Sequence, residues 1–408
     1  MSLQSSSWSK TIVAELGQVV TGKTPPTKQT EFFGDEYPFI TPTDITDRQR
    51  SIVTERYLSS EGHEYLKNYL LPPGAICFVS IGATIGKICM TARPSFTNQQ
   101  INSIVVDERK HDPRFVYYLL RYNANRIKGI AGGAATPIVN KSTFSEVDIL
   151  VPPLSVERKI GDILSAYDDL IENNTRRIKV LEEMARAIYR EWFVHFRFPG
   201  HEKVKLVDSR LRRIPEGWEV KRLGDLALVN ESSIKKGDEP SEINYVDIAS
   251  VSKGQILQTE NLPFKEAPGR ARRKVKHGDI IWSSVRPNLR AYALILDPVP
   301  NLIVSTGFAV ISPKLVPYTY LYQVVTTHEF VEYLVNHTRG AAYPAVNTED
   351  FDNAKILVPH AKILSVYDEV VSHLFPLRQR LFEKNANLRC TRDLLLPKLI
   401  SGNRGIAI

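Results

Sequence analysis

One stretch of the sequence has the letters of a phosphate-binding loop. Residues 17–24, GQVVTGKT, match the pattern in which a glycine-rich loop, a lysine and a threonine hold nucleotide phosphates. In a working site the loop runs directly into a helix whose first amides bind the phosphate. Here Pro25 and Pro26 follow at once, and a residue before proline is disfavoured in helical geometry. We therefore expect no nucleotide site, and we expect Lys23 and Thr24 to lie in a loop open to a nucleic-acid phosphate or to solvent.

Other catalytic patterns are absent from the sequence. It contains no Asp/Asn-Pro-Pro-Tyr/Phe string, which an amino-methyltransferase needs, and no Gly-x-Gly-x-x-Gly string for a dinucleotide or S-adenosylmethionine. The pair His328-Glu329 lacks the second histidine of a zinc-protease helix, and the three cysteines form no Cys-x-x-Cys pair. We therefore expect no catalytic residue and no metal site in this chain.

The polar residues of the expected loops suit contacts with DNA. Lys and Arg neutralise phosphates, Asn and Gln pair with adenine, and Arg pairs with guanine. The candidates of the first half are Lys23, Thr24, Lys28, Thr84, Lys87, Asn98, Gln99 and Gln100. The candidates of the second half are Lys235, Lys236, Arg270, Arg272, Arg273, Lys274, Ser284, Arg286, Asn288 and Arg290. The alternative for each is a solvated charge or an Asn-Gln pair that closes a turn. Because the second set is more basic, we expect it to bind DNA with the steeper salt dependence.

Composition limits the class of protein. The chain has 408 residues, of which 43% are hydrophobic and 24% are charged, so a disordered or fibrous chain is excluded and two or three domains are expected. Lys and Arg number 53 against 45 for Asp and Glu, a net charge of +8, which is compatible with a polyanionic partner. The sequence shows neither a secretory signal nor a membrane span. We expect a cytoplasmic protein with no membrane partner.

The sequence repeats itself in the same order. Residues 133–140, GAATPIVN, return as residues 340–347, GAAYPAVN, and each is followed by a phenylalanine and by Leu-Val-Pro. Farther on, ILSAYD at 163–168 returns as ILSVYD at 363–368. Each copy has a part rich in short strand-like runs, followed by a helical part. The predicted fold class is therefore α+β, with two pseudo-symmetric mixed α/β recognition globules separated by two long helices.

The two helical parts predict an antiparallel coiled coil. Apolar residues recur every seven positions in both. The predicted seam consists of Ile160, Tyr167, Asn174, Leu181 and Ile188 with Tyr367, Leu374, Leu381 and Leu388. Asn174 at a seam position should fix the register of the helices. The first copy has seven more residues between its Leu-Val-Pro and its tyrosine, so its helix should start about two turns earlier. Pro376 should make the second helix start late or bend.

Taken together, these residues resemble the specificity subunit of type I restriction–modification systems. The resemblance spans the chain. It rests on PIVN at 137–140 with VPPL at 151–154, IENN at 171–174 with LEE at 181–183, YREWF at 189–193 with RFPG at 197–200, IPEGW at 214–218, RPNLR at 286–290 and DLLLPKLISG at 393–402. It implies a target-recognition domain over residues 1–152, a long spacer helix over 153–200, a second target-recognition domain over 201–358 and a second spacer helix over 359–408.

The resemblance also implies partners. Each recognition domain reads one half of a bipartite sequence in double-stranded DNA. The helices set the spacing and dock two modification (methyltransferase) subunits, and restriction subunits (translocase and endonuclease) join through the complex. S-adenosylmethionine, ATP and Mg are expected on those partners, and this chain binds no cofactor. The complex that the family forms is an N6-adenine DNA methyltransferase and ATP-dependent endonuclease, whose specificity subunit is not catalytic.

Two other interpretations are compatible with the sequence. The chain could be a self-contained DNA methyltransferase or nuclease, against which the missing motifs argue. It could also be a scaffold that binds proteins and no DNA. Binding of the pure chain to DNA at low salt, and its loss at high salt, would separate the scaffold from the other interpretations.

Overall fold

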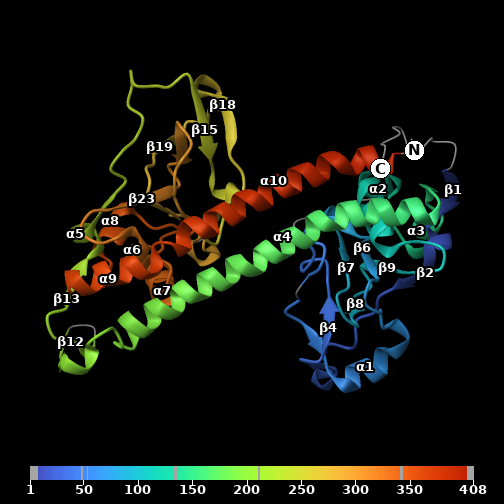
Figure 1. Ribbon diagram of the computed structural model, residues 1–408, viewed down its shortest axis with the longest axis horizontal. Coiled ribbons are helices and arrows are strands. Elements are labelled where there is room, and N and C mark those ends of the chain that lie inside the picture. Colours follow the sequence, from blue (N-terminus) through green and yellow to red (C-terminus); the bar gives the residue numbers. More distant parts are fainter. Residues whose placement is uncertain are drawn as a thin grey trace. The chain divides into compact units, whose positions relative to one another are not determined.

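The chain forms two compact units, each built around sheets and helices. The computed structural model describes residues 8–46, 49–52, 54–131, 137–209, 212–340 and 343–401 (Figure 1). Contacts divide the chain into unit 1, Met1–Thr175 with Lys384–Ile408, and unit 2, Arg176–Glu383. The predicted four-part division at residues 152, 200 and 358 stays a prediction.

Unit 1 is organised around a four-stranded antiparallel sheet. Its strands, in spatial order, are β2 (Gly17–Thr21), β9 (Ile101–Val106), β6 (Ile76–Val79) and β7 (Ile88–Met90). Its long helix α2 (Pro113–Ile130) is capped by Asp112, whose side chain accepts hydrogen bonds from the amides of Arg114 and Phe115. A second sheet has the order β3 (Phe33–Gly34), β5 (Tyr57–Leu58), β4 (Tyr37–Ile40) and β8 (Phe96–Thr97), and helix α1 (Ser60–Leu66) lies next to it. Strand β1 (Ser9–Ile12) pairs with β10 (Asp148–Val151), which follows helix α3 (Lys141–Ser145).

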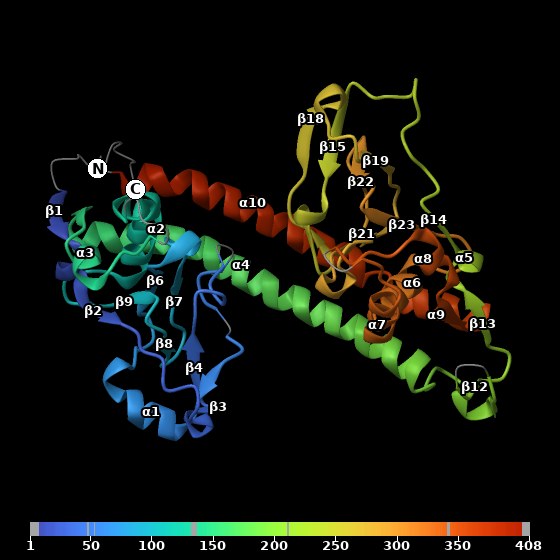
Figure 2. The same ribbon diagram turned by 180° about the vertical axis from the view of Figure 1, so that it is seen from behind.

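Unit 2 repeats this plan. Its main sheet has the order β14 (Ala227–Val229), β23 (Phe308–Pro313), β20 (Ile280–Ser283) and β21 (Tyr292–Leu294). Its second sheet has the order β18 (Glu260–Pro263), β15 (Glu242–Val246), β22 (Leu302–Ser305) and β19 (Ala271–Lys274) (Figure 2). Further strands form short pairs: β13 (Glu219–Arg222) with β24 (Lys355–Val358), β11 (Leu206–Val207) with β12 (Ile214–Pro215), and β16 (Val251–Ser252) with β17 (Gln255–Ile256). Its shorter helices are α5 (Leu223–Leu226), α6 (Tyr318–Val325), α7 (His328–Asn336) and α8 (Thr348–Asn353).

The matching strand orders confirm the duplication that the sequence predicts. The main sheets correspond strand by strand, β2-β9-β6-β7 in unit 1 and β14-β23-β20-β21 in unit 2. Each unit also has a separate antiparallel pair, β1 with β10 in unit 1 and β13 with β24 in unit 2. Phe144 and Phe351, the phenylalanines that follow the two repeated motifs, are both fully buried. Residues 133–136 and 341–342 of those motifs lie outside the described part of the chain.

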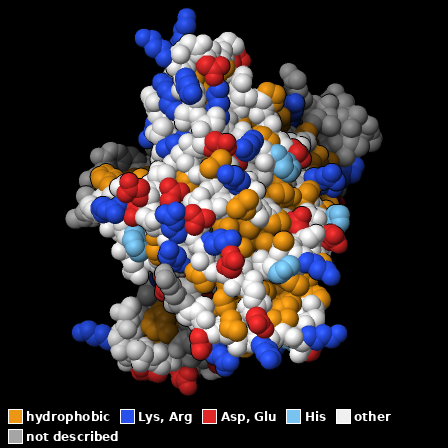
Figure 3. Space-filling model, turned by 90° about the vertical axis from the view of Figure 1, so that its left-hand side faces the viewer, with side chains coloured by type: hydrophobic (Ala, Val, Ile, Leu, Met, Phe, Trp, Pro, Cys, Tyr) orange, Lys and Arg blue, Asp and Glu red, His pale blue; other side chains and the backbone are white. Residues whose placement is uncertain are grey.

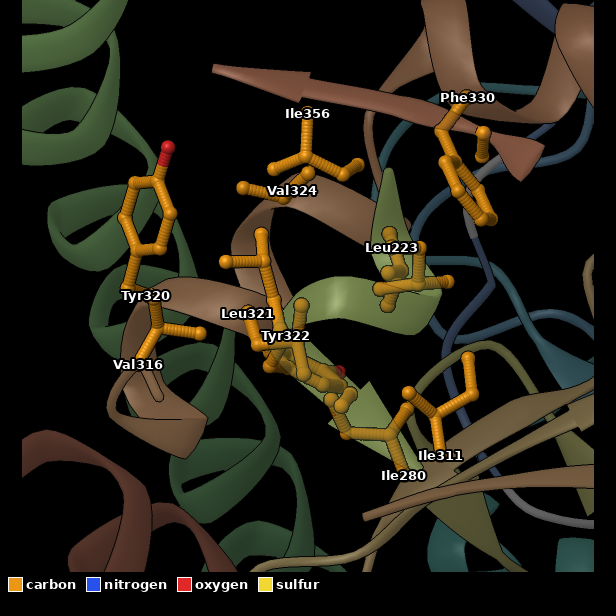
Figure 4. Packing of buried hydrophobic residues seen from close by; sticks show 14 of the residues in the cluster. Leu223, Ile280, Ile311, Val316, Tyr320, Leu321, Tyr322, Val324, Phe330 and Ile356 are labelled. Atoms are coloured by element: carbon orange, nitrogen blue, oxygen red, sulfur yellow. The ribbon is translucent and has the colours of Figure 1, made fainter. Parts of the chain in front are cut away.

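The core of unit 2 is filled by apolar side chains from helices and strands far apart in the sequence. Leu223, Ile280, Ile311, Tyr320 and Phe330 converge from α5, β20, β23, α6 and α7 (Figure 4). The indole of the buried Trp282 donates a hydrogen bond of 2.8 Å to the carbonyl of Val325. This core fixes the main sheet against the helices, and so it fixes the loops at the sheet's edges.

The long helices begin where the heptad pattern places them. Helix α4 (Leu154–Tyr189) starts 13 residues before Tyr167, whereas α9 (Ala361–Val371) starts six before Tyr367. The first helix therefore starts seven residues earlier, about two turns, as predicted. A π-helical turn, Arg190–Val194, follows α4.

Pro376 interrupts the second helical part, as the sequence predicts. Helix α9 ends at Val371 and helix α10 (Leu374–Ile400) begins three residues later. The proline ring would clash with the carbonyl four residues earlier, at Ser372, which disfavours a continuous helix through that residue. In the first turn of α10 the missing amide hydrogen of Pro376 costs no helical hydrogen bond.

The long helices pack antiparallel within each unit. In unit 1, Asp168 of α4 contacts Arg392 of α10, and Asn174 of α4 contacts Asn385 of α10. Because the later residue of α4 meets the earlier residue of α10, the two helices run in opposite directions. In unit 2, Glu182 of α4 lies 3.5 Å from Arg378 of α10. The predicted seam residues fall into two groups. The buried ones are Ile160, Asn174, Tyr367 and Leu381, and the half-buried ones are Tyr167, Leu181, Ile188, Leu374 and Leu388.

Candidate nucleic-acid interface

The candidate residues of unit 1 gather at one end of the strands of its main sheet, which we call the loop edge. Thr21 at the end of β2 pairs with Asn102 near the start of β9, and Val79 at the end of β6 pairs with Ile101. The loops after β2, before β9 and after β6 therefore meet there. The candidates carried by these three loops are Lys23, Thr24, Thr84, Lys87, Asn98, Gln99 and Gln100. Lys28 is exposed farther along the loop after β2.

Hydrogen bonds connect the first and second of these loops. The Thr24 hydroxyl donates to Gln99 Oε1 at 2.6 Å, and the Lys23 amide donates to the Thr97 carbonyl at 3.0 Å. The Asn98 side chain donates to Gln100 Oε1 at 3.2 Å and accepts from the Gln100 amide at 3.1 Å. Asn98 thus closes a turn, whereas the exposed Gln99 lies at the surface of the edge.

Aromatic side chains surround Lys23, and the sequence alone does not single them out. The Lys23 ammonium lies 5.5 Å from the ring centroid of Tyr65 and 5.7 Å from that of Tyr69. Tyr65 also stacks on Phe32, with centroids 4.7 Å apart, and is 46% exposed. Such cation–π contacts hold a lysine in place while its charge stays available to an anion.

Unit 2 brings its candidates to the corresponding edge. The Ser284 amide donates to the Gly307 carbonyl at 2.8 Å, so the loop after β20 lies against the start of β23. The Ile234 amide donates to the Arg272 carbonyl at 2.8 Å, which places the loop after β14 beside β19. Lys235 and Lys236 are exposed in that loop. Figure 3, which faces the left-hand side of Figure 1, shows Lys and Arg side chains gathered at its upper end.

Several charges of the 270–274 run already have partners within the protein. Lys274 pairs with Asp238 at 2.5 Å, and Arg270 lies 3.8 Å from Asp247. The Arg272 guanidinium lies 4.9 Å from the Phe264 ring centroid. Arg273 is half-buried, and burial lowers the pKa of its guanidinium. The densest positive run in the sequence therefore presents less net charge than its letters suggest.

The loop after β6 in unit 1 and the loop after β20 in unit 2 have similar backbones. Ile85 donates to the Gly82 carbonyl at 3.2 Å in unit 1, and Leu289 donates to the Arg286 carbonyl at 2.9 Å in unit 2. Both loops contain a 3-10 turn, Gly82–Thr84 and Pro287–Leu289. Both also hold two left-handed residues four apart, at φ 70° and 95° in unit 1 and at φ 49° and 55° in unit 2.

Residue types at these left-handed positions differ between the units. Unit 1 has Gly82 and Gly86, whereas unit 2 has Arg286 and Arg290. Left-handed geometry costs an L-residue about 1–2 kcal/mol, and glycine avoids this cost. Strain of this kind is concentrated at functional positions in proteins. The signal for this difference is present in the sequence, because an alignment of residues 80–87 with residues 284–291 pairs each glycine with an arginine.

Three features considered from the sequence can be compared with the described part of the chain. Residues 17–24 form strand β2 and the loop after it, where a phosphate-binding loop needs a helix. Over the described ranges, no three His, Cys, Asp or Glu side chains gather so that they could hold a metal ion. None of the helices described is both long and apolar enough to cross a membrane.

The chain contains two copies of an α+β globule, each with a polar loop edge and each followed by a long helix. These features define a class of DNA sequence-recognition subunits. The sequence profile of one family, described as "Type I restriction modification DNA specificity domain", matches residues 5–183 and 215–374. The chain belongs to this family, and the resemblance seen in the sequence is confirmed. Its role is DNA target recognition in a type I restriction–modification system.

Relatives and a solved structure agree with this assignment. The MjaIX specificity subunit of Methanocaldococcus jannaschii is 28% identical over 411 residues, which cover 97% of this chain and 93% of that protein. The HindI specificity subunit of Haemophilus influenzae is 34% identical over 182 residues, which cover 43% of this chain and 39% of that protein. The crystal structure of the S subunit from M. genitalium superposes with a TM-score of 0.60 at 16% identity, covering 96% of each chain, and so shares the fold.

Proposed function

We propose that each unit reads one half of a two-part sequence in double-stranded DNA through the loop edge of its main sheet. The observation that carries the proposal is the duplicated edge: the same strands, in the same order, bring three polar loops together in each unit. Exposed Lys and Arg there suit phosphates, and Gln, Asn and Arg suit base edges. The proposed DNA-binding set is the one named from the sequence. Within it, Asn98 closes a turn, and the charges of Lys274 and Arg270 are partly neutralised by acidic side chains.

The long helices act as the dock for methyltransferase subunits in this proposal. Apolar side chains remain exposed on the helices in both units: Leu170 (47%) and Leu394 (61%) in unit 1, and Val180 (53%) and Met184 (47%) in unit 2. Val180 and Met184 are four residues apart, so they lie on the same face of α4. A contiguous exposed apolar face of this kind supports a protein partner, whereas single exposed apolar residues do not. The methyltransferase and restriction subunits would supply S-adenosylmethionine, ATP and Mg, and this chain would supply sequence choice without catalysis.

Selection from a random DNA pool tests the two-part reading. The full chain, in the complex with which it purifies, is incubated with duplexes randomised over 40 base pairs, and bound duplexes are sequenced. We expect two short half-sites with a spacer of fixed length. Insertion of one heptad in α4 and one in α10 should change the spacer and leave both half-sites unaltered, because the insertion preserves the helical seam. Altered half-sites would contradict the division of roles between edges and helices.

The alternative functions predict different results. A self-contained methyltransferase would transfer a labelled methyl group from S-adenosylmethionine to DNA as a pure chain, which a specificity subunit does not do. A protein-binding scaffold would enrich no DNA sequence even at low salt.

A further inference from the structure

The loop 284–290 of unit 2 holds arginine where its counterpart in unit 1 holds glycine. Steric space does not explain the glycine at position 82, because a Cβ there would meet no atom within 4 Å. Only the left-handed backbone favours glycine. Unit 2 is also left-handed at the two aligned positions, with Arg286 at φ 49° and Arg290 at φ 55°. Both loops therefore need left-handed backbone at these positions, but only unit 2 places a side chain there.

The rest of unit 2 prevents the loop from relaxing this strain. The Arg286 amide donates to the Pro344 carbonyl at 2.8 Å, and the Val346 amide donates to the Ser284 carbonyl at 2.9 Å. Unit 1 has the same pair of bonds, from Gly82 to Pro137 and from Val139 to Ser80, each at 2.9 Å. The repeated Pro-x-Val-Asn motif therefore acts as a brace for the loop after the central strand.

Arg286 is positioned by an exposed aromatic ring that the same brace carries. Its guanidinium lies 5.1 Å from the ring centroid of Tyr343, and Tyr343 is 71% exposed. A tyrosine this exposed gains little from burial, so its ring is available as a platform for the guanidinium. The N–H donors of a guanidinium lie in its own plane, in a fork geometry that pairs with a planar partner.

Arg290 has different surroundings. One of its guanidinium nitrogens lies 3.3 Å from His328 Nδ1, and the residue lines a cavity of about 890 Å³ together with Tyr292, Tyr322 and Arg378. The two left-handed arginines of the loop therefore have different contacts. Arg286 contacts an exposed ring, whereas Arg290 contacts α7 and lines the cavity beside α4.

We propose that Arg286 reads a guanine in the major groove of the half-site bound by unit 2, and that Tyr343 positions it. A guanidinium donates two parallel hydrogen bonds to O6 and N7 of guanine, a pattern that no other base offers in that groove. A braced backbone and the cation–π contact with Tyr343 restrict the orientations of this fork before DNA binds, which lowers the entropy lost on binding. The inference rests on the proposed function, because it assigns one base pair of that function's target to one residue.

The test is selection from the same random 40-base-pair pool by the full chain in its complex, for wild type and four variants. Arg286→Gly keeps the backbone of unit 1 and removes the reader. Arg290→Gly relieves the matching strain elsewhere in the loop. Tyr343→Ala removes the platform, and Tyr343→Phe restores a ring without the hydroxyl. Melting temperatures of all variants show whether they fold.

We expect Arg286→Gly to lose tenfold or more of the preference for G·C at a single position of one half-site, while the other half-site is unchanged. Its melting temperature should rise by about 2–4 °C, because strain is relieved. Tyr343→Ala should weaken the preference at the same position, and Tyr343→Phe should retain it. Arg290→Gly should show the same rise in melting temperature, and its loss of affinity should be equal for all sequences.

Two results overturn the inference in distinguishable ways. If the wild type yields a two-part sequence and Arg286→Gly selects the same sequence, or loses affinity uniformly, the assignment of Arg286 is wrong and the proposed function stands. If the wild type enriches no sequence, the proposed function fails and this inference fails with it.

Discussion

The side-chain amide of Asn174 donates a hydrogen bond of 2.9 Å to Asn385 Oδ1 between α4 and α10. Asn385 in turn donates to the Thr175 hydroxyl at 3.3 Å and to the Ile171 carbonyl at 3.4 Å. Both asparagines are almost fully buried, at 4% and 2% exposure. A buried amide pair is satisfied in one register of the helices, so it selects that register over neighbouring ones.

The first prediction concerns this pair. Asn174→Leu should lower the free energy of unfolding by about 1–3 kcal/mol, because it leaves Asn385 Oδ1 buried without its hydrogen-bond donor. Replacement of both asparagines by leucine should recover most of that loss, since an apolar pair leaves no amide unsatisfied. Urea unfolding of the two single variants and the double variant gives the coupling energy. A double variant whose loss equals the sum of the single losses would show that the amides do not interact.

A second prediction concerns the ion pair between Asp168 and Arg392. Both side chains are 2% exposed, and Tyr118 donates a hydrogen bond to the same carboxylate. Arg392→Met should lower the free energy of unfolding by about 3–5 kcal/mol, because it leaves a buried carboxylate without its countercharge. Replacement of both charged residues by leucine should be much less harmful than Arg392→Met alone. Thermal unfolding measures both effects.

The exposed pair Lys179–Glu183 of α4 is the control for that prediction. Its atoms are 3.8 Å apart and its side chains are 77% and 57% exposed, so Lys179→Met should change the free energy of unfolding by under about 1 kcal/mol. Equal losses for Lys179→Met and Arg392→Met would show that burial does not set the strength of the Asp168 pair.

The sequence predicts the helices but not their buried charges. Apolar spacing and the repeated ILSxYD motif are enough to predict duplication, a pair of long helices and a role for Asn174 in their register. Asp168, Arg378 and Arg392 are buried as well, yet a charged residue read along one helix looks solvated. Its partner lies more than 200 residues away in the case of Asp168 and Arg392, so the pairing depends on the register of two helices, which periodicity alone does not specify.

The sequence predicts the candidate loops but not the contacts of their side chains. Loops that follow strands of one sheet can be named from the sequence, and the structure brings them to one edge in each unit. The sequence does not reveal which lysines find acidic partners, such as Lys274 with Asp238, or which aromatic residues stay exposed, such as Tyr343. Both depend on contacts between segments that the chain order separates.

A third prediction concerns the acid sensitivity of the brace that carries Tyr343. Arg339 donates hydrogen bonds of 2.7 and 3.1 Å to the buried Asp350, whose carboxylate also accepts from the Asn347 amide at the start of α8. The hydrogen bond from Arg339 is the main cause that holds the pKa of Asp350 below its ordinary value of 3.8. A carboxyl with a depressed pKa contributes stability above its unfolded pKa and loses it as the pH falls through the folded value.

Asp350→Asn should therefore be less stable than wild type at pH 7, by about 1–2 kcal/mol. The difference should persist down to about pH 3.8 and disappear below it, as Asp350 of the wild type becomes protonated. Melting temperatures between about pH 7 and pH 2.5 check this, with Glu349→Gln as the control because Glu349 is exposed beside it. A difference that stays constant throughout this range would exclude ionisation of Asp350 as its source.

The fourth prediction concerns the salt dependence of DNA binding by unit 2. Lys235 and Lys236 are exposed in the loop after β14, whereas Lys274 on the neighbouring β19 is neutralised by Asp238 at 2.5 Å. Each phosphate contact contributes about 0.9 to the slope of log K against log salt concentration. We expect the double variant Lys235→Gln, Lys236→Gln to flatten the slope by about 2, and Lys274→Gln to flatten it by less than half as much per lysine.

Fluorescence anisotropy of a labelled duplex between about 50 and 200 mM salt gives the slopes of both variants. The selected half-sites should not change in either variant, because phosphate contacts carry no base information. Equal flattening per residue would mean that the pair between Lys274 and Asp238 opens when DNA binds, since the lysine would then release as many counterions as its exposed neighbours. An unchanged slope in the double variant would show that Lys235 and Lys236, in the loop after β14, do not contact DNA phosphates.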